Sequence, residues 1–201
     1  VTGEIVGTYA VAEDMSASTE STLSCAVEGD SVNGVKIAVP DAELATHVVV
    51  LVKGSKGPEL RLVDLSSDGV EVSLQKNLDK SRSFYKVAFN NAQSSLLGEQ
   101  GSGWESHVHI MDQAAVLFAF EQVGGSQQAL DMAKEYAMER YAFGRQIGSY
   151  QAIKHKLADM YVAVTLAKSN CYYGAWALSS ESSELPLAAA TSRVSATKAF
   201  Q

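Results

Sequence analysis

The chain has 201 residues, of which 46% are hydrophobic and 19% are charged, a composition typical of globular proteins. No apolar stretch approaches the roughly 20 residues that a membrane-spanning helix needs. The net charge of −7 argues against a general nucleic-acid surface, because phosphate binding relies on clustered Lys and Arg. We therefore expect neither a membrane span nor a nucleic-acid partner.

The two cysteines, Cys25 and Cys171, lie far apart and match no metal-binding spacing. Neither a disulfide framework nor a metal site is expected, and we expect a reduced, cytoplasmic setting. The sequence opens without an initiator Met or a signal-peptide pattern and stops inside a helical pattern. We expect both ends to be cuts in a longer protein.

The first half of the sequence carries the pattern of a β-sheet. Short runs rich in Val and Leu recur between Gly, Asp, Asn and Ser, and some of them alternate apolar and polar residues. The Asn33-Gly34 pair is a hairpin signal, since both residues readily take the positive φ of a tight turn. We predict an antiparallel β-domain, a barrel or sandwich, over residues 1–98. The predicted strands are 4–12, 21–29, 47–53, 60–65, 69–74 and 85–89.

From about Gly103, apolar residues recur at steps of three and four, the spacing of one helix face. Ser149 is placed to cap a second helix, and Pro186 to open a third. Because long helices with one apolar stripe are stable only when packed together, we predict an incomplete antiparallel helical bundle over 99–201. The fold class is thus α+β, with two domains. The predicted face of the first helix comprises Val108, Met111, Ala115, Phe118, Gln122, Val123, Ser126, Leu130, Ala133 and Ala137.

The segment MERYAFGRQIGSYQ, residues 138–151, forms a tight link between the first two helices. Arg140 ends one helix, where a cation is favourable by roughly 0.3 to 1 kcal/mol without any ligand. Alternatively, Arg140 projects its guanidinium toward a phosphate, while Phe143 supplies an apolar wall and Gln151 a further hydrogen bond. The spacing alone leaves both interpretations open.

A longer stretch around this link, residues 136–178, closely resembles the carboxy-terminal helical domain of acyl-CoA dehydrogenases. LLGEQGSGW, residues 96–104, resembles the family's joint between its β-domain and its helices. More faintly, GEIVGTYAVAEDMSASTE resembles the stretch ending in T-E-P-x-A-G-S-D, and SVNGVKIAVPDAELATHVVVLV resembles N-G-x-K-x-W-I-T-N-G. The resemblance implies a truncated family fold: the middle β-domain and part of the carboxy-terminal bundle.

The resemblance also implies an activity. Enzymes of this family remove a proton from the α carbon of an acyl-CoA and pass a hydride from the β carbon to FAD. An electron-transfer flavoprotein-type acceptor is then an expected partner. Arg140, Phe143 and Gln151 match residues that reach a neighbouring subunit's FAD, and Ser18 matches a residue that contacts the thioester ligand.

The departures from the family pattern imply a degenerate flavin pocket. Ala12 stands for the Thr of T-E-P, and Ala38 and Val39 are assigned to the Trp and Thr of W-I-T. Loss of a hydroxyl and of a stacking ring weakens flavin contacts. The family's catalytic Glu lies either early in the first long helix, where Ala114 and Ala115 stand here, or beyond Gln201. The catalytic base is therefore unassigned.

These features together predict one subunit of an acyl-CoA dehydrogenase that is active only with a partner. The pattern resembles the α2β2 heterotetramers of sterol-degrading bacteria, so a steroid side-chain acyl-CoA is the expected substrate. Two alternatives remain open. One is an ordinary homotetrameric dehydrogenase whose base lies beyond residue 201, and the other is a non-catalytic scaffold subunit.

Other polar residues are weaker candidates for chemistry. His107 and His109 alternate near a helix start and do not share a face, so metal binding is not expected there. His155 is read as a helix residue rather than a catalyst. Lys80, Arg82 and Lys86 are read as part of a solvated turn rather than a phosphate site; none of these residues enters the predicted site.

Overall fold

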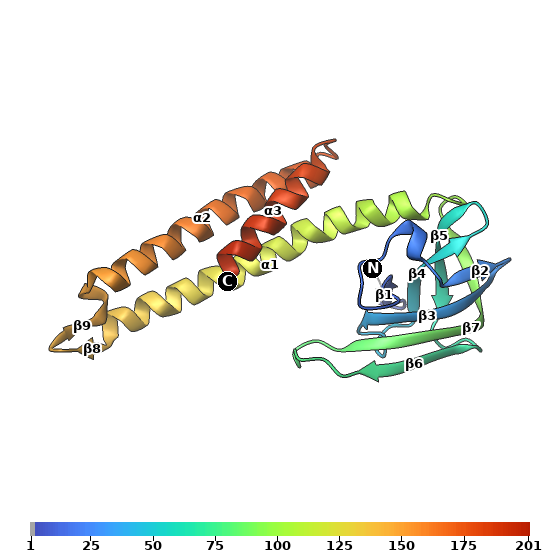
Figure 1. Ribbon diagram of the computed structural model, residues 1–201, viewed down its shortest axis with the longest axis horizontal. Helices are drawn as coiled ribbons and strands as arrows, with labels where there is room; N and C mark the ends of the chain where they lie inside the picture. Colours follow the sequence, from blue (N-terminus) through green and yellow to red (C-terminus); the bar gives the residue numbers. More distant parts are fainter. Residues whose placement is uncertain (1–2) are drawn as a thin grey trace. The chain divides into compact units, whose positions relative to one another are not determined.

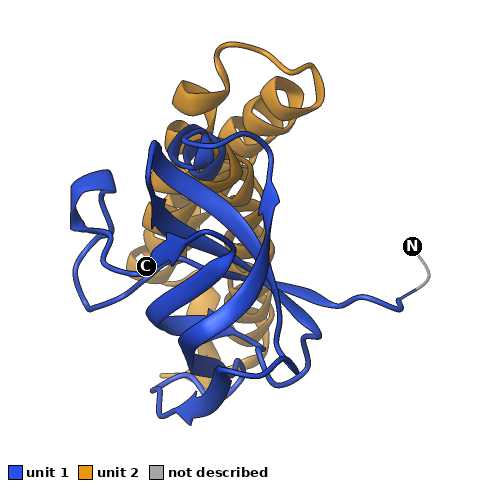
Figure 2. Cartoon of the chain, turned by 90° about the vertical axis from the view of Figure 1, so that its right-hand side faces the viewer, with its two compact units in different colours: residues 1–108 blue, residues 109–201 orange. Residues whose placement is uncertain are grey.

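The structure, a computed structural model, describes residues 3–201. The chain divides into two compact units, residues 1–108 and 109–201, coloured separately in Figure 2. The first unit holds the β-sheet and the first turns of the helix α1. The second holds the rest of α1 with the helices α2 and α3, as the ribbon in Figure 1 shows.

The first unit contains one seven-stranded sheet that closes on itself. The strands β4, β2, β3, β7 and β5 pair in that order, and β5 pairs again with β4. The strand β1 shares one edge of β4 with β2, and β6 shares one edge of β7 with β5. The bounds are β1 (Gly7–Ala10), β2 (Ala26–Glu28), β3 (Ser31–Pro40), β4 (His47–Gly54), β5 (Gly57–Asp64), β6 (Val70–Gln75) and β7 (Phe84–Leu97).

The sheet is mixed, so the predicted purely antiparallel arrangement is wrong in part. β1 runs parallel to β4, with Gly7 opposite His47, and β2 meets β4 in the same sense, with Ala26 opposite Lys53. The alternation of apolar residues identifies the face that each strand buries, but it says nothing about the direction of the neighbouring strand. The architecture is a closed, barrel-like sheet rather than a sandwich.

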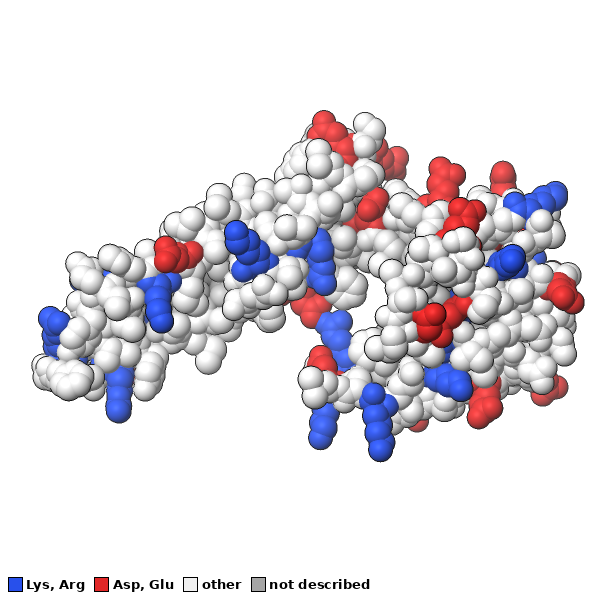
Figure 3. Space-filling model, in the orientation of Figure 1, with Lys and Arg blue, Asp and Glu red and all other residues white. Residues whose placement is uncertain are grey.

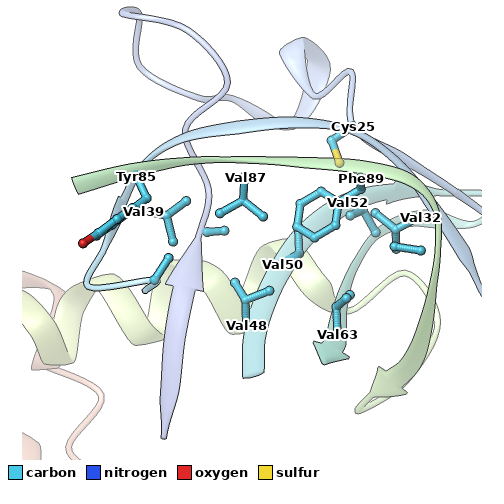
Figure 4. Close-up of a cluster of buried hydrophobic side chains, with 13 residues drawn as sticks. Cys25, Val32, Val39, Val48, Val50, Val52, Val63, Tyr85, Val87 and Phe89 are labelled. Atoms are coloured by element: carbon cyan, nitrogen blue, oxygen red, sulfur yellow. The ribbon is translucent and has the colours of Figure 1, made fainter. Parts of the chain in front are cut away.

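The core of this unit is built mainly from β-branched residues, which suit a pleated surface. Val48, Val50 and Val52 point inward at every second position of β4, and all three are fully buried (Figure 4). Most of the other residues in this core come from β1, β3, β5 and β7. The remaining buried members of this core are Ala10, Cys25, Val32, Val39, Ala42, Val63, Tyr85, Val87, Phe89 and Ala92.

A hairpin does form where Asn33-Gly34 predicted one, but its turn lies earlier. Gly29 and Asp30 join β2 to β3, and Gly29 has a φ of 61°. Gly34 lies inside β3, where a Cβ would come within 2.7 Å of the Cys25 backbone. Asn33 accepts a hydrogen bond from the backbone N–H of Asn91, at 2.8 Å. This pair therefore permits a close strand contact instead of a turn.

The helices are α1 (Gly103–Glu139), α2 (Gln151–Ser179) and α3 (Leu185–Phe200). Pro186 lies in the first turn of α3, as predicted. The predicted face of α1 is partly wrong, because Val108, Met111 and Phe118 are exposed while Val116 and Ala119 are buried. Small side chains let the helices approach closely, so alanines form much of this core. Its buried members are Val116, Ala119, Val123, Ala167, Cys171, Ala177, Leu185, Ala188, Ala189 and Ala196.

Among residues 3–201, no helix is both long enough and apolar enough to cross a membrane. Within the same residues, no group of three or more His, Cys, Asp or Glu side chains is arranged to hold a metal ion.

Candidate functional site

The link between α1 and α2 is a small folded motif rather than a bare turn. The strands β8 (Tyr141–Ala142) and β9 (Arg145–Gln146) form a two-residue hairpin, and a 3-10 turn, η2 (Ile147–Ser149), leads into α2. Phe143 and Gly144 are the central turn residues, with φ of 51° and 80°. Two successive positive φ angles are typical of a type I′ turn, which favours Asn-Gly over a bulky residue.

Phe143 is therefore in a costly position. A positive φ costs a non-glycine residue roughly 1 to 2 kcal/mol, and this ring is 98% exposed, so packing against the other described residues does not offset that cost. Strained residues of this kind concentrate at binding and catalytic sites. The conformation of Phe143 thus marks the hairpin tip as a candidate binding element.

Short contacts close the link on both sides. The Ile147 N–H donates to the carbonyl of Arg140 at 2.8 Å. A Cβ on Gly148 would come within 2.9 Å of the Ala137 carbonyl oxygen, so the 3-10 turn lies against the last turns of α1. Ser149 does not cap α2 as predicted, because its hydroxyl donates to Gln146 and Tyr150 occupies the N-cap position. The link holds a defined shape.

The three predicted residues of this link lie within one short segment of the chain. Arg140 directly follows α1, Phe143 is at the hairpin tip, and Gln151 is the first residue of α2. All three are exposed, and the Arg140 guanidinium makes no hydrogen bond or ion pair with any described residue. Figure 3 shows Lys and Arg side chains around the end that carries β8 and β9. A guanidinium without a described partner and an exposed ring, both in one link, suit an anionic, partly aromatic ligand.

Ser18, the fourth predicted residue, lies in the first unit, in a loop that one carboxylate fastens. Glu13 accepts hydrogen bonds from the backbone N–H groups of Ser24 (2.7 Å) and Cys25 (3.0 Å) and from the Ser24 hydroxyl. Residues 14–23 are thereby closed into a loop, and Ser18 is half-buried within it. The hydrogen bonds of Glu13 therefore hold together the two ends of the loop that carries Ser18.

Glu13 is held from the core by a lysine. Lys36 is fully buried, and its Nζ donates to Glu13 Oε1 at 2.7 Å and to the Val11 carbonyl at 2.9 Å. Burial raises the pKa of Glu13, but the bonds from Lys36, Ser24 and Cys25 together lower it below its ordinary value. The carboxylate is therefore ionised at neutral pH, as a buried ion pair requires.

The family model for the carboxy-terminal domain of acyl-CoA dehydrogenases matches residues 101–201, half of the chain. The chain belongs to the acyl-CoA dehydrogenase family. It is 31% identical over 188 residues to the mitochondrial isovaleryl-CoA dehydrogenase of Oryza sativa subsp. japonica. That match covers 86% of this chain and 46% of the rice enzyme, so the chain spans less than half the length of this relative.

Solved structures agree on the fold. An FAD-dependent dehydrogenase superposes with a TM-score of 0.90 at 28% identity, over 99% of this chain and 57% of the other. The steroid ACAD Tcur3481-Tcur3483 superposes with a TM-score of 0.75 at 24% identity, over 98% of this chain and 49% of the other. The sheet of the first unit and the helices of the second unit thus both have counterparts in these solved structures.

In the β-domain of this acyl-CoA dehydrogenase chain, the assignment of Val39 to the Thr of W-I-T is wrong. Val39 is fully buried in the core, so its side chain cannot line an open flavin pocket. When N-G of the family pattern is placed on Asn33-Gly34, W-I-T falls on 38–40, so Val39 stands for the Ile and Pro40 for the Thr. Ala38 is exposed, with a φ of 51°, and its N–H donates to Gln75 Oε1 at 2.7 Å. Pro40 lacks a side-chain donor as well, so the departure from the family pattern persists.

His107 lies in a buried polar contact of the first unit. Its Nδ1 is 2.8 Å from the Tyr9 hydroxyl, and its ring centroid is 5.2 Å from that of Trp104. Burial raises the pKa of Tyr9 to about 12, so the phenol keeps its proton and can donate it to a neutral imidazole. Burial, and then the nearby charge of Lys36, lower the pKa of His107. These contacts connect the start of α1 to β1.

We expect His107 to make the first unit less stable in mild acid. Because its folded pKa is depressed, its contribution is fully present above the unfolded value of about 6.5 and is lost as pH falls through the folded pKa. Urea unfolding followed at about pH 7.5 and 5.5 should show a loss of stability that His107→Gln reduces. His155→Gln, at an exposed position of α2, serves as the control. An equal loss of stability between the two pH values for both variants would contradict this assignment.

The two residues at the link that sequence patterns missed are Arg145 and Tyr150. The Arg145 guanidinium lies 4.0 Å from the centre of the Tyr150 ring, and the Tyr150 hydroxyl donates to the Ala142 carbonyl at 2.9 Å. The only sequence signal was an aromatic residue directly before a helix, and its partner is set by the hairpin, which the sequence pattern did not predict.

Ala114 and Ala115, at one of the family's two positions for the catalytic Glu, have no side chain that can accept a proton.

Proposed function

We propose that this chain is part of a subunit of an FAD-dependent acyl-CoA dehydrogenase, in which the link between α1 and α2 contacts FAD held mainly by a partner subunit. The observation that carries the proposal is the Phe143 ring, exposed and held at a positive φ in the same short link as Arg140, whose guanidinium has no partner among the described residues. Such an arrangement gains nothing in the isolated chain and suits a ligand that arrives with a neighbouring subunit.

Each residue of the link has a distinct role. Arg140 neutralises a phosphate of the dinucleotide through charge-assisted hydrogen bonds. Phe143 covers an apolar part of the same ligand, and Gln151, at the start of α2, adds an amide that can donate or accept. Ser18, on the loop that Glu13 closes, contacts the acyl-CoA thioester.

The chemistry is α,β-dehydrogenation of an acyl-CoA. A base removes the α proton as the β carbon loses a hydride, so a C=C bond forms and two electrons leave the substrate. Bound FAD supplies the acceptor for that hydride, which no side chain can provide. Residues 1–201 contribute positioning to this reaction, and an electron-transfer flavoprotein-type acceptor would be the partner that takes up the electrons.

Two features support a heteromeric assembly and a steroid acyl-CoA. Ala12, Ala38 and Pro40 lack the hydroxyls and ring with which the family pattern holds its own flavin. The steroid ACAD Tcur3481-Tcur3483 shares the fold. A reduced, cytoplasmic setting is part of the proposal, because Cys25 and Cys171 are both buried free thiols.

The test is expression of the full-length protein alone and together with related acyl-CoA dehydrogenase subunits. We expect the protein alone to retain little flavin and to lack activity, and the correct pair to be yellow and to oxidise a steroid side-chain acyl-CoA with an artificial electron acceptor. Flavin absorbance per subunit and substrate-dependent bleaching are the two measurements.

Each alternative has its own outcome. A full-length protein that is yellow and active by itself would replace the heteromeric proposal with an ordinary homomeric dehydrogenase. A protein that assembles with a partner, while Arg140→Ala leaves both flavin content and turnover unchanged, would indicate a scaffold subunit.

A further inference from the structure

We propose that Tyr150 is a positioning residue that holds the Phe143 hairpin in register with the start of α2. This inference rests on the proposed function, because it explains how the link presents Phe143 and Gln151 together. Tyr150 is half-buried and has no catalytic or ligand-contacting role of its own in this proposal.

Tyr150 is bonded to both elements that it would join. Its backbone carbonyl accepts the N–H groups of Ile153 (3.1 Å) and Lys154 (3.0 Å), the first bonds of α2. Its hydroxyl donates to the carbonyl of Ala142, the residue before Phe143, at 2.9 Å. One side chain therefore ties the hairpin turn to the helix that begins with Gln151.

The hairpin needs such a tie. Its ladder comprises only the pairs Tyr141 with Gln146 and Ala142 with Arg145, and an isolated two-stranded hairpin is marginal in water. The positive φ of Phe143 makes this turn costlier than the Asn-Gly turns that form readily. An added hydrogen bond to the carbonyl that enters the turn offsets part of that cost.

The Arg145 side chain also contacts Tyr150. Its guanidinium lies 4.0 Å from the Tyr150 ring centre, within the range of a cation–π contact. This contact commits Arg145 to the ring, whereas the Arg140 guanidinium has no partner among the described residues. The link thus separates a structural cation from a cation that is free to bind an anion.

The experiment compares Tyr150→Phe with Tyr150→Leu in the full-length protein assembled with its partner subunit. The first variant removes only the hydroxyl, and the second also removes the ring under Arg145. Tyr161→Phe is the matched control, since Tyr161 is an exposed tyrosine of α2. Two quantities are measured: hydrogen–deuterium exchange of the peptide 141–150, and FAD affinity by titration of the apoprotein. Arg140→Ala is run in parallel.

We expect Tyr150→Phe to speed exchange of the hairpin amides and to raise the Kd for FAD, each about fivefold, with a larger change for Tyr150→Leu and none for Tyr161→Phe. The inference is overturned if exchange is unchanged, or if exchange rises while FAD affinity does not. A loss of affinity without faster exchange would also overturn it, because Tyr150 would then act as a direct contact. If Arg140→Ala leaves FAD affinity unchanged, the proposed function fails instead.

Discussion

Replacing Arg140 with Ala should weaken FAD binding by about 10- to 100-fold in the full-length protein assembled with its partner. The estimate follows from the roughly 1.5 to 3 kcal/mol that a hydrogen bond to a charged group contributes, converted at 1.4 kcal/mol per tenfold change. The guanidinium makes no bond within the described chain, so its removal should leave the fold intact. Titration of the apoprotein with FAD measures the change, and thermal unfolding of the apoprotein checks stability.

Two variants sharpen this result. Lys168→Ala removes an exposed cation from the middle of α2 and should leave FAD affinity unchanged. Arg140→Lys keeps the charge but loses the planar fork, so it should recover only part of the affinity. If Lys168→Ala weakened binding as much as Arg140→Ala, a general effect of net charge would replace the specific contact.

The second large effect concerns the buried ion pair beneath the Ser18 loop. Lys36→Met should destabilise the first unit by roughly 3 to 5 kcal/mol, because it leaves the Glu13 carboxylate without its counter-charge. Urea unfolding is followed by Trp104 fluorescence in a Trp176→Phe background, because Trp104 lies in the first unit. The exposed Lys86 lies on the neighbouring strand β7, so Lys86→Met is a matched control that should change stability by less than about 0.5 kcal/mol.

A double variant distinguishes charge from packing. Glu13→Gln combined with Lys36→Met removes both charges and should be less destabilised than the sum of the two single variants. Additive losses would mean that the pair does not interact, in spite of its 2.7 Å contact. A loss for Lys36→Met no greater than that for Lys86→Met would contradict the buried pair itself.

The parts of the fold that sequence predicts well are those in which local pattern and packing agree. The texture changes at Gly103, where α1 begins, and Pro186 lies in the first turn of α3. The predicted face of α1 is less accurate, because alanines such as Ala119 are buried in the helical core while large residues such as Phe118 are exposed. Hydrophobicity alone does not rank a small residue above a large one.

Contacts between distant residues set the features that sequence does not predict. Gly34 reads as a turn glycine, yet its lack of a Cβ serves the approach of Cys25, the residue before β2. The parallel direction of β1 depends on how the chain crosses the barrel, which no local pattern records. The hairpin at Phe143 lacks the usual Asn-Gly signal, because a bulky residue holds the first positive φ of its turn.

The most direct measurement is an experimental structure of the full-length assembly with FAD bound. The account predicts that the Arg140 guanidinium lies within hydrogen-bonding distance of a phosphate of FAD seated mainly in the neighbouring subunit, with Phe143 against the same ligand. A structure in which that guanidinium points into bulk water, away from every subunit boundary, would contradict it.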